Sequence, residues 1–280
     1  MRPARPGREI EVRHALDRET GEPLVLKVLL PDASPTLTAR FQNECSMTPA
    51  ESRPFLVRQV NIDAQTPRTL LATEFVSGLS LQQKFQTGRP ITFQKKLKIL
   101  DTLCQAVAEV HHMGVVHGDI APSNVLVQED GSSCLIDFGL AQQLHHPHST
   151  AKDTSLKLKP NTESAIAKSA TQISGTPGFL SPEAIRLEPL RVESDIYSWG
   201  CIAFFLLSET LPFKGRTPIE IIWKQKNQPP PALQNPAKNF QQATTRVHSL
   251  VLQCMQILPE DRPTDINTVR ETLIRLRAET

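Results

Sequence analysis

Five polar residues stand at places in the chain where their chemistry could be used: Lys27, Glu44, Asp119, Asn124 and Asp137. Lys27 interrupts the apolar run LVLKVLL, where an unpaired ammonium would be costly to bury, and Glu44 is a candidate partner. Singly, each has an ordinary structural explanation, such as a lysine that extends to solvent or an Asp that caps a turn. Together they match phosphoryl transfer, which uses oxygen ligands for Mg²⁺ (Asn124, Asp137), a cation for phosphates (Lys27) and a carboxylate that orients a hydroxyl (Asp119).

The composition is that of an ordinary globular protein. The chain has 280 residues, enough for one large domain or two small ones, with 39% hydrophobic residues and a net charge of +2. This charge indicates no nucleic-acid partner. The five cysteines are scattered without a CxxC pair, which favours reduced thiols in a cytoplasmic protein. The longest apolar run, Ile196 to Leu207, is too short for a membrane span and no signal peptide is visible, so we expect no direct membrane insertion.

The elements that must position these residues fall into two regions. The first third is β-rich, with apolar runs that predict strands at 22–30, 55–62 and 68–76 around a helix at 36–47. A long amphipathic helix capped by Thr92 follows, and then a hairpin of strands 123–127 and 133–138. A Ser- and Thr-rich stretch, 142–174, predicts a long loop, and helices are expected at 194–207, 218–226, 245–258 and 264–277.

Five ordered segments of the sequence resemble protein kinases. HGDIAPSN resembles their catalytic loop, DFGLA their magnesium loop and GTPGFLSPEA the end of their activation loop. SDIYSWGCIAFFLLSETLPF resembles their central large-lobe helix, and PEDRPT the turn whose arginine pairs with the Glu of SPE. The resemblance is to the eukaryotic-type, bacterial-like serine/threonine protein kinase domain. It implies one kinase domain over 1–280 with an α+β, two-lobed fold: a small β-rich N-lobe with the hinge (1–76) and a larger helical C-lobe (77–280) that carries an activation loop (137–183).

The resemblance also implies a role for each matched residue. Asp119 would be the catalytic base, Asn124 and Asp137 the magnesium ligands, and Lys27 the phosphate contact that Glu44 holds in place. Arg262 would pair with Glu183, Asp195 would brace the catalytic-loop backbone, and Thr176 would contact Asp119. The nucleotide pocket would be formed by Gly7, Val12, Val25, Thr73, Glu74, Val76 and Leu126. The expected cofactors are ATP and Mg²⁺, and the expected partners are protein substrates, including the chain's own activation loop.

Several positions depart from the family pattern. With Val12 aligned on the last residue of the glycine-rich loop motif, only Gly7 remains, Arg5 and Ile10 replace the other glycines, and the first strand is expected to be truncated. Side chains there should weaken the backbone cradle for phosphate. Ala121 stands where serine/threonine kinases carry a lysine, a loss that should cost about 3 kcal/mol, or ~10²-fold in rate. Gly118 replaces the arginine that normally receives an activation-loop phosphate.

Three functions are compatible with these residues. The sequence favours an active serine/threonine protein kinase of reduced rate. The alternative is a pseudokinase that binds nucleotide or a partner without efficient transfer. A small-molecule kinase of the aminoglycoside or choline type also shows HGD followed by Asn, but GTPGFLSPE and Arg262 indicate a peptide-substrate platform that such enzymes lack.

Overall fold

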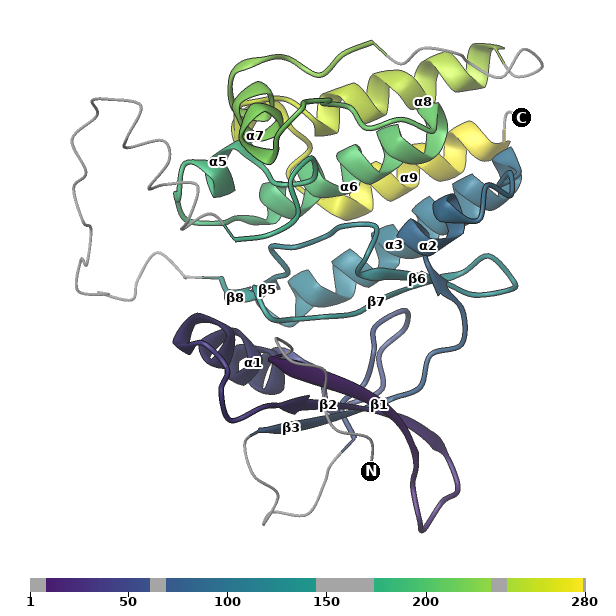
Figure 1. The fold of residues 1–280 in the computed structure, drawn as a ribbon. Helices are drawn as coiled ribbons and strands as arrows, with labels where there is room; N and C mark the ends of the chain where they lie inside the picture. The colour runs from purple at the N-terminus through teal and green to yellow at the C-terminus, as the bar shows by residue number, and fades with distance from the viewer. Residues whose placement is uncertain (1–8, 61–68, 145–173, 233–240, 279–280) are drawn as a thin grey trace, which may run out of the picture.

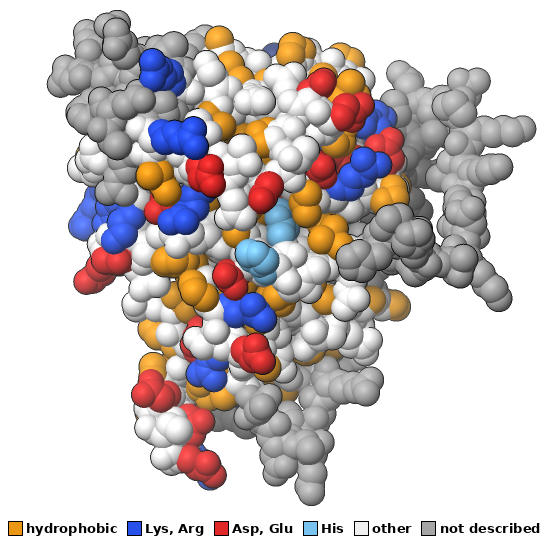
Figure 2. Space-filling view, turned by 180° about the vertical axis from the view of Figure 1, so that it is seen from behind, with side chains coloured by type: hydrophobic (Ala, Val, Ile, Leu, Met, Phe, Trp, Pro, Cys, Tyr) orange, Lys and Arg blue, Asp and Glu red, His pale blue; other side chains and the backbone are white. Residues whose placement is uncertain are grey.

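The computed structural model describes residues 9–60, 69–144, 174–232 and 241–278. These residues form a small sheet-containing lobe, at the bottom of Figure 1, and a larger helical lobe above it. The predicted α+β fold with a β-rich small lobe and a helical large lobe is confirmed. On the face opposite to that view, acidic and basic side chains are interspersed (Figure 2), as the small net charge suggests.

The small lobe contains an antiparallel sheet of three strands, β1 (Ile10–Leu16), β2 (Pro23–Leu29) and β3 (Leu70–Glu74). Val12 pairs with Lys27 in register, and Val25 pairs with Thr73. Because paired residues point to the same face and side chains alternate along a strand, these four residues share one face of the sheet. The predicted strands 22–30 and 68–76 are therefore present, whereas Gly7 and the expected truncated strand lie outside the described residues.

The predicted strand at 55–62 is wrong for its described part. Leu56 and Gln59 form only isolated bridges, the first to Leu135 in the large lobe and the second to Thr73. Accordingly, the Val57 N–H donates to the Leu135 carbonyl (3.1 Å), while the carbonyl of Arg58 accepts from Glu74 in β3. The segment changes partner from one lobe to the other within three residues, so no continuous ladder forms. We call residues 55–60 the bridging segment.

Helix α1 (Pro35–Met47) joins β2 to the rest of the small lobe. Pro35 suits the first helical turn, where its missing N–H costs nothing, and the helix ends at Thr48 because a residue before proline avoids helical backbone. Phe41 packs against Leu29 of β2 and Leu71 of β3 in a small core of its own. This packing fixes the helix face that carries Glu44, which is buried.

The large lobe is built on α3 (Phe93–His112) and α6 (Val192–Ser208), which pack against each other. The predicted Thr92 cap is present, since its side chain accepts from the Lys95 N–H. The remaining helices are α2 (Leu81–Gln86), α5 (Pro182–Ile185), α7 (Pro218–Asn227), α8 (Gln241–Cys254), a 3₁₀ turn η1 (Pro259–Asp261) and α9 (Ile266–Ala278). A side chain at Gly200 would meet Met255 at 2.8 Å, so glycine permits the close approach of α6 to the end of α8. None of the helices in the described ranges is long and apolar enough to span a membrane.

Short strands fix the loops that carry the candidate site. They are β4 (Leu79–Ser80), β5 (Val115–Val116), β6 (Val125–Val127), β7 (Ser133–Leu135) and β8 (Gln142–Gln143). The predicted hairpin is formed by β6 and β7, and β5 pairs with β8. Asp119 and Asn124 therefore lie in the β5–β6 connection and Asp137 just after β7. These strands lie on the side of the large lobe that faces the small lobe (Figure 1).

Both predicted bounds of one helix differ from the structure, since α8 covers Gln241–Cys254 where 245–258 was expected. Helix α8 ends at Cys254, four residues before the expected end at 258, and Arg262 accounts for the difference. Its guanidinium donates to the carbonyls of Gln256 (2.8 Å) and Ile257 (3.0 Å), which satisfies them outside a helix. Most of the predicted loop at 142–174 lies outside the described residues.

Candidate active site

The half-buried carboxylate of Asp119 is held from two sides. On one side Asn124 donates through its amide to the Oδ2 atom (3.0 Å) and to the Asp119 carbonyl (2.9 Å). On the other, the backbone N–H and the hydroxyl of Thr176 donate to Oδ1 at 3.1 and 3.2 Å. The predicted contact between Thr176 and Asp119 is present. Three hydrogen bonds to the carboxylate and one to the backbone carbonyl of the same residue thus fix Asp119 in one orientation, which a positioned base requires.

The backbone before Asp119 is supported by Asp195, which is fully buried on α6. Its two oxygens accept from the N–H groups of His117 (2.8 Å) and Gly118 (2.9 Å), and Oδ2 also contacts His111 Nε2 at 2.9 Å. Gly118 has a φ of 76°, which glycine adopts without strain, and a Cβ there would lie 2.9 Å from the Leu140 carbonyl oxygen. The predicted brace is therefore in place, and a side chain at residue 118 would require a local rearrangement.

Lys27 connects the small lobe to the magnesium loop. Its ammonium hydrogen-bonds to Glu44 and lies 3.6 Å from the Asp137 carboxylate. Burial alone would lower the pKa of Lys27, but the charges of Asp137 and Glu44 outweigh it, so its pKa is raised and the ammonium stays charged. Burial, with the charge of Asp137, raises the pKa of Glu44 although Lys27 opposes that shift. The predicted contact of Glu44 with Lys27 is thus present, and Asp137, predicted separately as a magnesium ligand, lies beside the same ammonium.

Asn43 ties α1 to the magnesium loop, and sequence reasoning missed this residue. Its side-chain amide donates to the carbonyls of Phe138 (3.2 Å), Gly139 (3.2 Å) and Ala141 (2.9 Å). The available signal was its place directly before Glu44 on the predicted helix. Because Asp137 has a φ of 70°, a left-handed conformation that costs roughly 1 kcal/mol, the loop after it needs such external support.

The predicted nucleotide-pocket residues lie on both sides of the lobe boundary. Thr73 is buried and Val25 is half-buried on the shared sheet face, while Val12 is 57% exposed on the same face. Val76 and Leu126 are partly buried against the large-lobe core.

At the hinge, the carboxylate of Glu74 accepts from the Arg58 N–H (3.1 Å) and so holds the bridging segment. A residue not foreseen from the sequence, His14, packs edge-on against Phe75 with ring centroids 5.3 Å apart. Within the described chain the Val76 N–H donates no hydrogen bond.

A cavity of about 250 Å³ lies between the lobes and gathers the charged groups. Its lining includes three predicted site residues, Glu44, Asp119 and Asp137. The other lining residues are Ile10, Leu37, Arg40, Phe41, Gly139, Leu140, Gly175 and Thr176. Ile10 thus places a side chain where the family has glycine. Ala121, by contrast, is fully buried in the large-lobe core.

The donor set fits a magnesium ion. Among the described residues no three His, Cys, Asp or Glu side chains converge on one point. Mg²⁺ needs only one or two protein oxygens when phosphates and water fill its other positions. Asp137 provides a carboxylate that is 42% exposed, and Asn124 keeps its Oδ1 turned away from Asp119, where Ser123 donates to it at 3.1 Å. These two oxygens would hold the ion.

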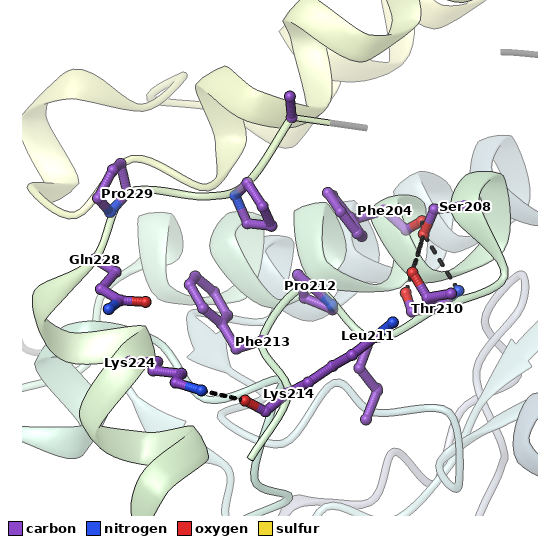
Figure 3. Close-up of a pocket in the computed structure, with 12 residues that line it drawn as sticks. Phe204, Ser208, Thr210, Leu211, Pro212, Phe213, Lys214, Lys224, Gln228 and Pro229 are labelled. Atoms are coloured by element: carbon purple, nitrogen blue, oxygen red, sulfur yellow. Dashed lines mark hydrogen bonds between the residues drawn. The ribbon is translucent and has the colours of Figure 1, made fainter. Parts of the chain in front are cut away.

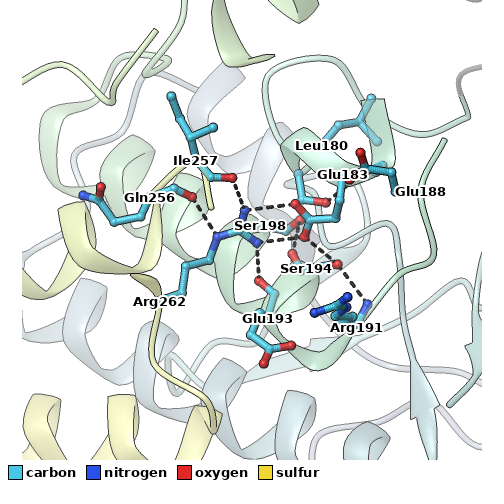
Figure 4. Close-up of polar contacts among 12 residues, drawn as sticks. Leu180, Glu183, Glu188, Arg191, Glu193, Ser194, Ser198, Gln256, Ile257 and Arg262 are labelled. Atoms are coloured by element: carbon cyan, nitrogen blue, oxygen red, sulfur yellow. Dashed lines mark hydrogen bonds and ion pairs between the residues drawn. The ribbon is translucent and has the colours of Figure 1, made fainter. Parts of the chain in front are cut away.

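The predicted ion pair of Glu183 and Arg262 is present beneath the activation segment (Figure 4). Both side chains are buried, and Ser194 adds a hydrogen bond of 2.6 Å to the Glu183 carboxylate. Burial would raise the pKa of Glu183, but Arg262 and Ser194 outweigh it and hold the pKa below its ordinary value. The pair joins the SPE segment to the turn after α8.

A second cavity, of about 420 Å³, lies in the large lobe between the end of α6 and α7. Figure 3 shows Phe204, Pro212 and Phe213 along it and Lys224 donating to the Lys214 carbonyl. It contains none of the predicted site residues.

Comparison with known proteins matches the same residues to one family. The family model described as the protein kinase domain covers residues 6–274. The chain is 27% identical over 272 residues to the serine/threonine-protein kinase PknB of Mycolicibacterium smegmatis, covering 95% of this chain and 40% of that protein. It is 26% identical to a probable serine/threonine-protein kinase of Streptomyces coelicolor (90% and 36% covered) and 27% identical to the serine/threonine-protein kinase pkn2 of Myxococcus xanthus (98% and 31% covered). The chain therefore spans less than half the length of these curated relatives.

Proposed function

The chain belongs to the protein kinase domain family, and from that premise we propose that it transfers the γ-phosphoryl group of ATP to serine and threonine hydroxyls of proteins. In this reaction the hydroxyl oxygen forms a bond to the γ-phosphorus while the bond from that phosphorus to the bridging oxygen breaks. ADP leaves, and the hydroxyl proton passes to Asp119. The curated relatives are longer proteins, so their individual substrates are not carried over to this chain. The substrate proposed here is only a class, the serine and threonine residues of proteins.

The observation that carries the proposal is the geometry around Asp119. Thr176 lies near the end of the expected activation loop (137–183) and contacts Oδ1, so the carboxylate is oriented by the same loop that must present a protein substrate. Asn124 contacts Oδ2 from the catalytic loop. In our proposal this carboxylate accepts the hydroxyl proton and aims the oxygen at the phosphorus.

The remaining residues bind and orient the nucleotide. Lys27 contacts the α- and β-phosphates, and Glu44 holds its ammonium through a hydrogen bond. Asn124 and Asp137 hold Mg²⁺, which when bound supplies positive charge to the phosphate oxygens. Valines of the shared sheet face (Val12, Val25), the hinge residues (Thr73, Glu74, Val76) and Leu126 enclose the adenine, with Gly7 in the loop above the phosphates.

We propose a reduced rate because two positions weaken phosphate binding. Ile10 puts a side chain into the cavity where backbone N–H groups would approach the phosphates. Ala121 carries no charge. The same two observations favour the second candidate, a pseudokinase that binds nucleotide or a partner, and only measured transfer separates the two.

The test has a binding arm and a transfer arm. Millimolar Mg-ATP should raise the melting temperature of the wild type, since a ligand at 100 times its dissociation constant adds about 2.7 kcal/mol, and Lys27→Met should lose most of that rise. Radiolabelled γ-phosphate should then appear on serine or threonine of a generic basic protein or of the chain itself. Asp119→Asn should abolish transfer, whereas Asp32→Asn, at an exposed turn, should not. Binding without transfer above the Asp119→Asn background would establish the pseudokinase.

We further propose that the chain is one of its own substrates. The described parts of the expected activation loop at Asp137 and Thr176 lie at the site, and the sequence between them carries many Ser and Thr residues, so their effective concentration should be high. Because Gly118 provides no charge for a phosphate, phosphorylation there should change activity little. Mass spectrometry of the chain after incubation with Mg-ATP locates the sites. A cytoplasmic location agrees with the buried free thiols of Cys104, Cys134, Cys201 and Cys254.

A further inference from the structure

One cation reaches into the cavity between the lobes. Of the described residues that line it, Arg40 on α1 is the only arginine or lysine, and it shares the lining with Asp119 and Asp137. Nothing in the sequence singles out Arg40, because it lies on a helix rich in polar residues. Its position in three dimensions, however, is next to the proposed reacting atoms.

The side chain of Arg40 crosses the cavity from the magnesium loop to the activation segment. At its base, the Arg40 Cβ lies 3.9 Å from where a Cβ would stand on Gly139, and the same point is 3.1 Å from Asp137 Oδ1. At its tip, Nη2 donates to the hydroxyl of Ser174. A Cβ on the next residue, Gly175, would lie 3.4 Å from Asp119 Oδ1. The side chain of Arg40 thus runs from beside Gly139 to Ser174, and it lines the same cavity as both aspartates.

Most N–H groups of the Arg40 guanidinium have no acceptor among the described residues. In the described part of the chain Arg40 forms no ion pair with a carboxylate, and its side-chain hydrogen bond goes to a neutral hydroxyl. A guanidinium has five N–H donors in a planar fork that suits phosphate oxygens. The cavity is lined by three carboxylates, those of Glu44, Asp119 and Asp137, and by this cation, which has no carboxylate partner in the described part of the chain. Such a lining suits a ligand that brings magnesium and several negative oxygens together.

The transferring group needs a cation that the catalytic loop does not supply. Ala121, at the position of the usual lysine, is fully buried and apolar. We propose that Arg40 contacts the γ-phosphoryl group in place of that lysine. This proposal rests on the proposed kinase function. While the substrate oxygen bonds to phosphorus and the bond to the bridging oxygen breaks, Arg40 stabilises the equatorial oxygens, and the proton still passes to Asp119.

Nucleotide binding tests the proposal without turnover. Calorimetry should compare Mg-ADP with Mg-AMP-PNP, an ATP analogue with nitrogen between the β- and γ-phosphorus. Arg40→Gln should weaken Mg-AMP-PNP binding about tenfold or more, because a charge-assisted contact to the γ-phosphoryl is lost, and change Mg-ADP binding less than twofold. Arg40→Lys, which keeps the charge, should fall in between. Arg18→Gln, in the exposed turn between β1 and β2, is the matched control and should change neither.

The variants also separate the possible failures. If Arg40→Gln weakens the binding of Mg-ADP and Mg-AMP-PNP equally, the proposal is overturned. It is also overturned if Ser174→Ala reproduces the effect of Arg40→Gln on binding, since Arg40 would then act through the activation segment. The proposal is likewise overturned if Arg40→Gln changes nucleotide binding only when Ser174 is phosphorylated. If the wild type binds neither nucleotide, the proposed kinase function itself fails. In transfer assays Arg40→Gln should lower kcat at least tenfold with the KM for the protein substrate unchanged.

Discussion

Arg262 and Glu183 lie 79 residues apart in the chain, yet they form a two-point ion pair, with Nη1–Oε1 at 2.8 Å and Nη2–Oε2 at 2.9 Å. The guanidinium also donates to the carbonyls of Glu193, Gln256 and Ile257 and lies 4.9 Å from the centre of the Tyr197 ring. Every donor of this buried cation is therefore used. The pair, drawn in Figure 4, joins α5, which carries Glu183, to the turn after α8.

Removing the cation should destabilise the large lobe strongly. Arg262→Met leaves the Glu183 charge buried without a partner, a change that costs about 3–5 kcal/mol. Urea unfolding followed by circular dichroism measures this difference. Arg275→Met, which removes an exposed arginine paired to Glu271 one helical turn away, should cost less than about 1 kcal/mol. A loss of similar size in both variants would contradict the prediction.

The same pair predicts a dependence of stability on pH. Because the folded state holds the pKa of Glu183 below its ordinary value, its contribution is present above that ordinary value and is lost as the pH falls through the folded pKa. The free energy of unfolding should thus decline as the pH falls from about 6 towards 3. The double variant Glu183→Gln/Arg262→Met, which leaves no unpaired charge, should show a shallower decline, and the control Glu188→Gln the full one. Identical pH profiles would mean that other carboxylates cause the acid sensitivity.

Asp195→Asn should loosen the catalytic loop. Asparagine offers one oxygen where the carboxylate accepts from His117, Gly118 and His111, so at least one buried donor loses its partner at a cost of about 1–3 kcal/mol. Hydrogen exchange should become faster at the His117 and Gly118 amides and remain unchanged in β2. An Asp32→Asn control should leave both regions as in the wild type. Protection that is unaffected at His117 would count against the brace.

Asn43→Ala should affect the magnesium requirement. Without its three hydrogen bonds the loop after Asp137 loses its tie to α1, and we expect the Mg²⁺ concentration for half-maximal transfer to rise about threefold to tenfold. Titration of Mg²⁺ at fixed ATP measures this. The neighbouring exposed Gln42 supplies the control, since Gln42→Ala should leave the titration unchanged. A fall in maximal rate with the same Mg²⁺ midpoint would assign Asn43 a role outside metal binding.

The sequence predicted the polar residues that interrupt apolar segments better than the residues that hold them in position. Asp119, Asn124 and Asp137 interrupt apolar segments, and their chemistry and spacing predicted a common site. Arg40 and Asn43 carry no such signal, because polar residues on an amphipathic helix are ordinary and only the placement of α1 against the magnesium loop gives them a role. Gly118 was visible as a missing arginine, but its positive φ and its tight fit against Leu140 appear only in three dimensions.

At the bridging segment, the strand pattern of the sequence likewise did not predict which strands the segment pairs with. The run from 55 to 62 has the apolar residues of a strand, and in its described part the backbone N–H groups of residues 56–60 all donate hydrogen bonds. They are divided between the two lobes, because Leu56 faces Leu135 and Gln59 faces Thr73. Periodicity reports that a segment is extended and partly buried, but it does not report with how many sheets the segment pairs.

The bridging segment has a mechanical consequence. The lobes are connected by covalent chain at the hinge after Glu74 and, beside it, by residues 55–60, which are hydrogen-bonded to β7 at one end and to β3 at the other. Two attachments side by side resist twisting and sliding, whereas they allow bending about the line that joins them. The small lobe should therefore rotate towards and away from the large lobe about this one axis, so that Lys27 and Arg40 approach Asp119 together.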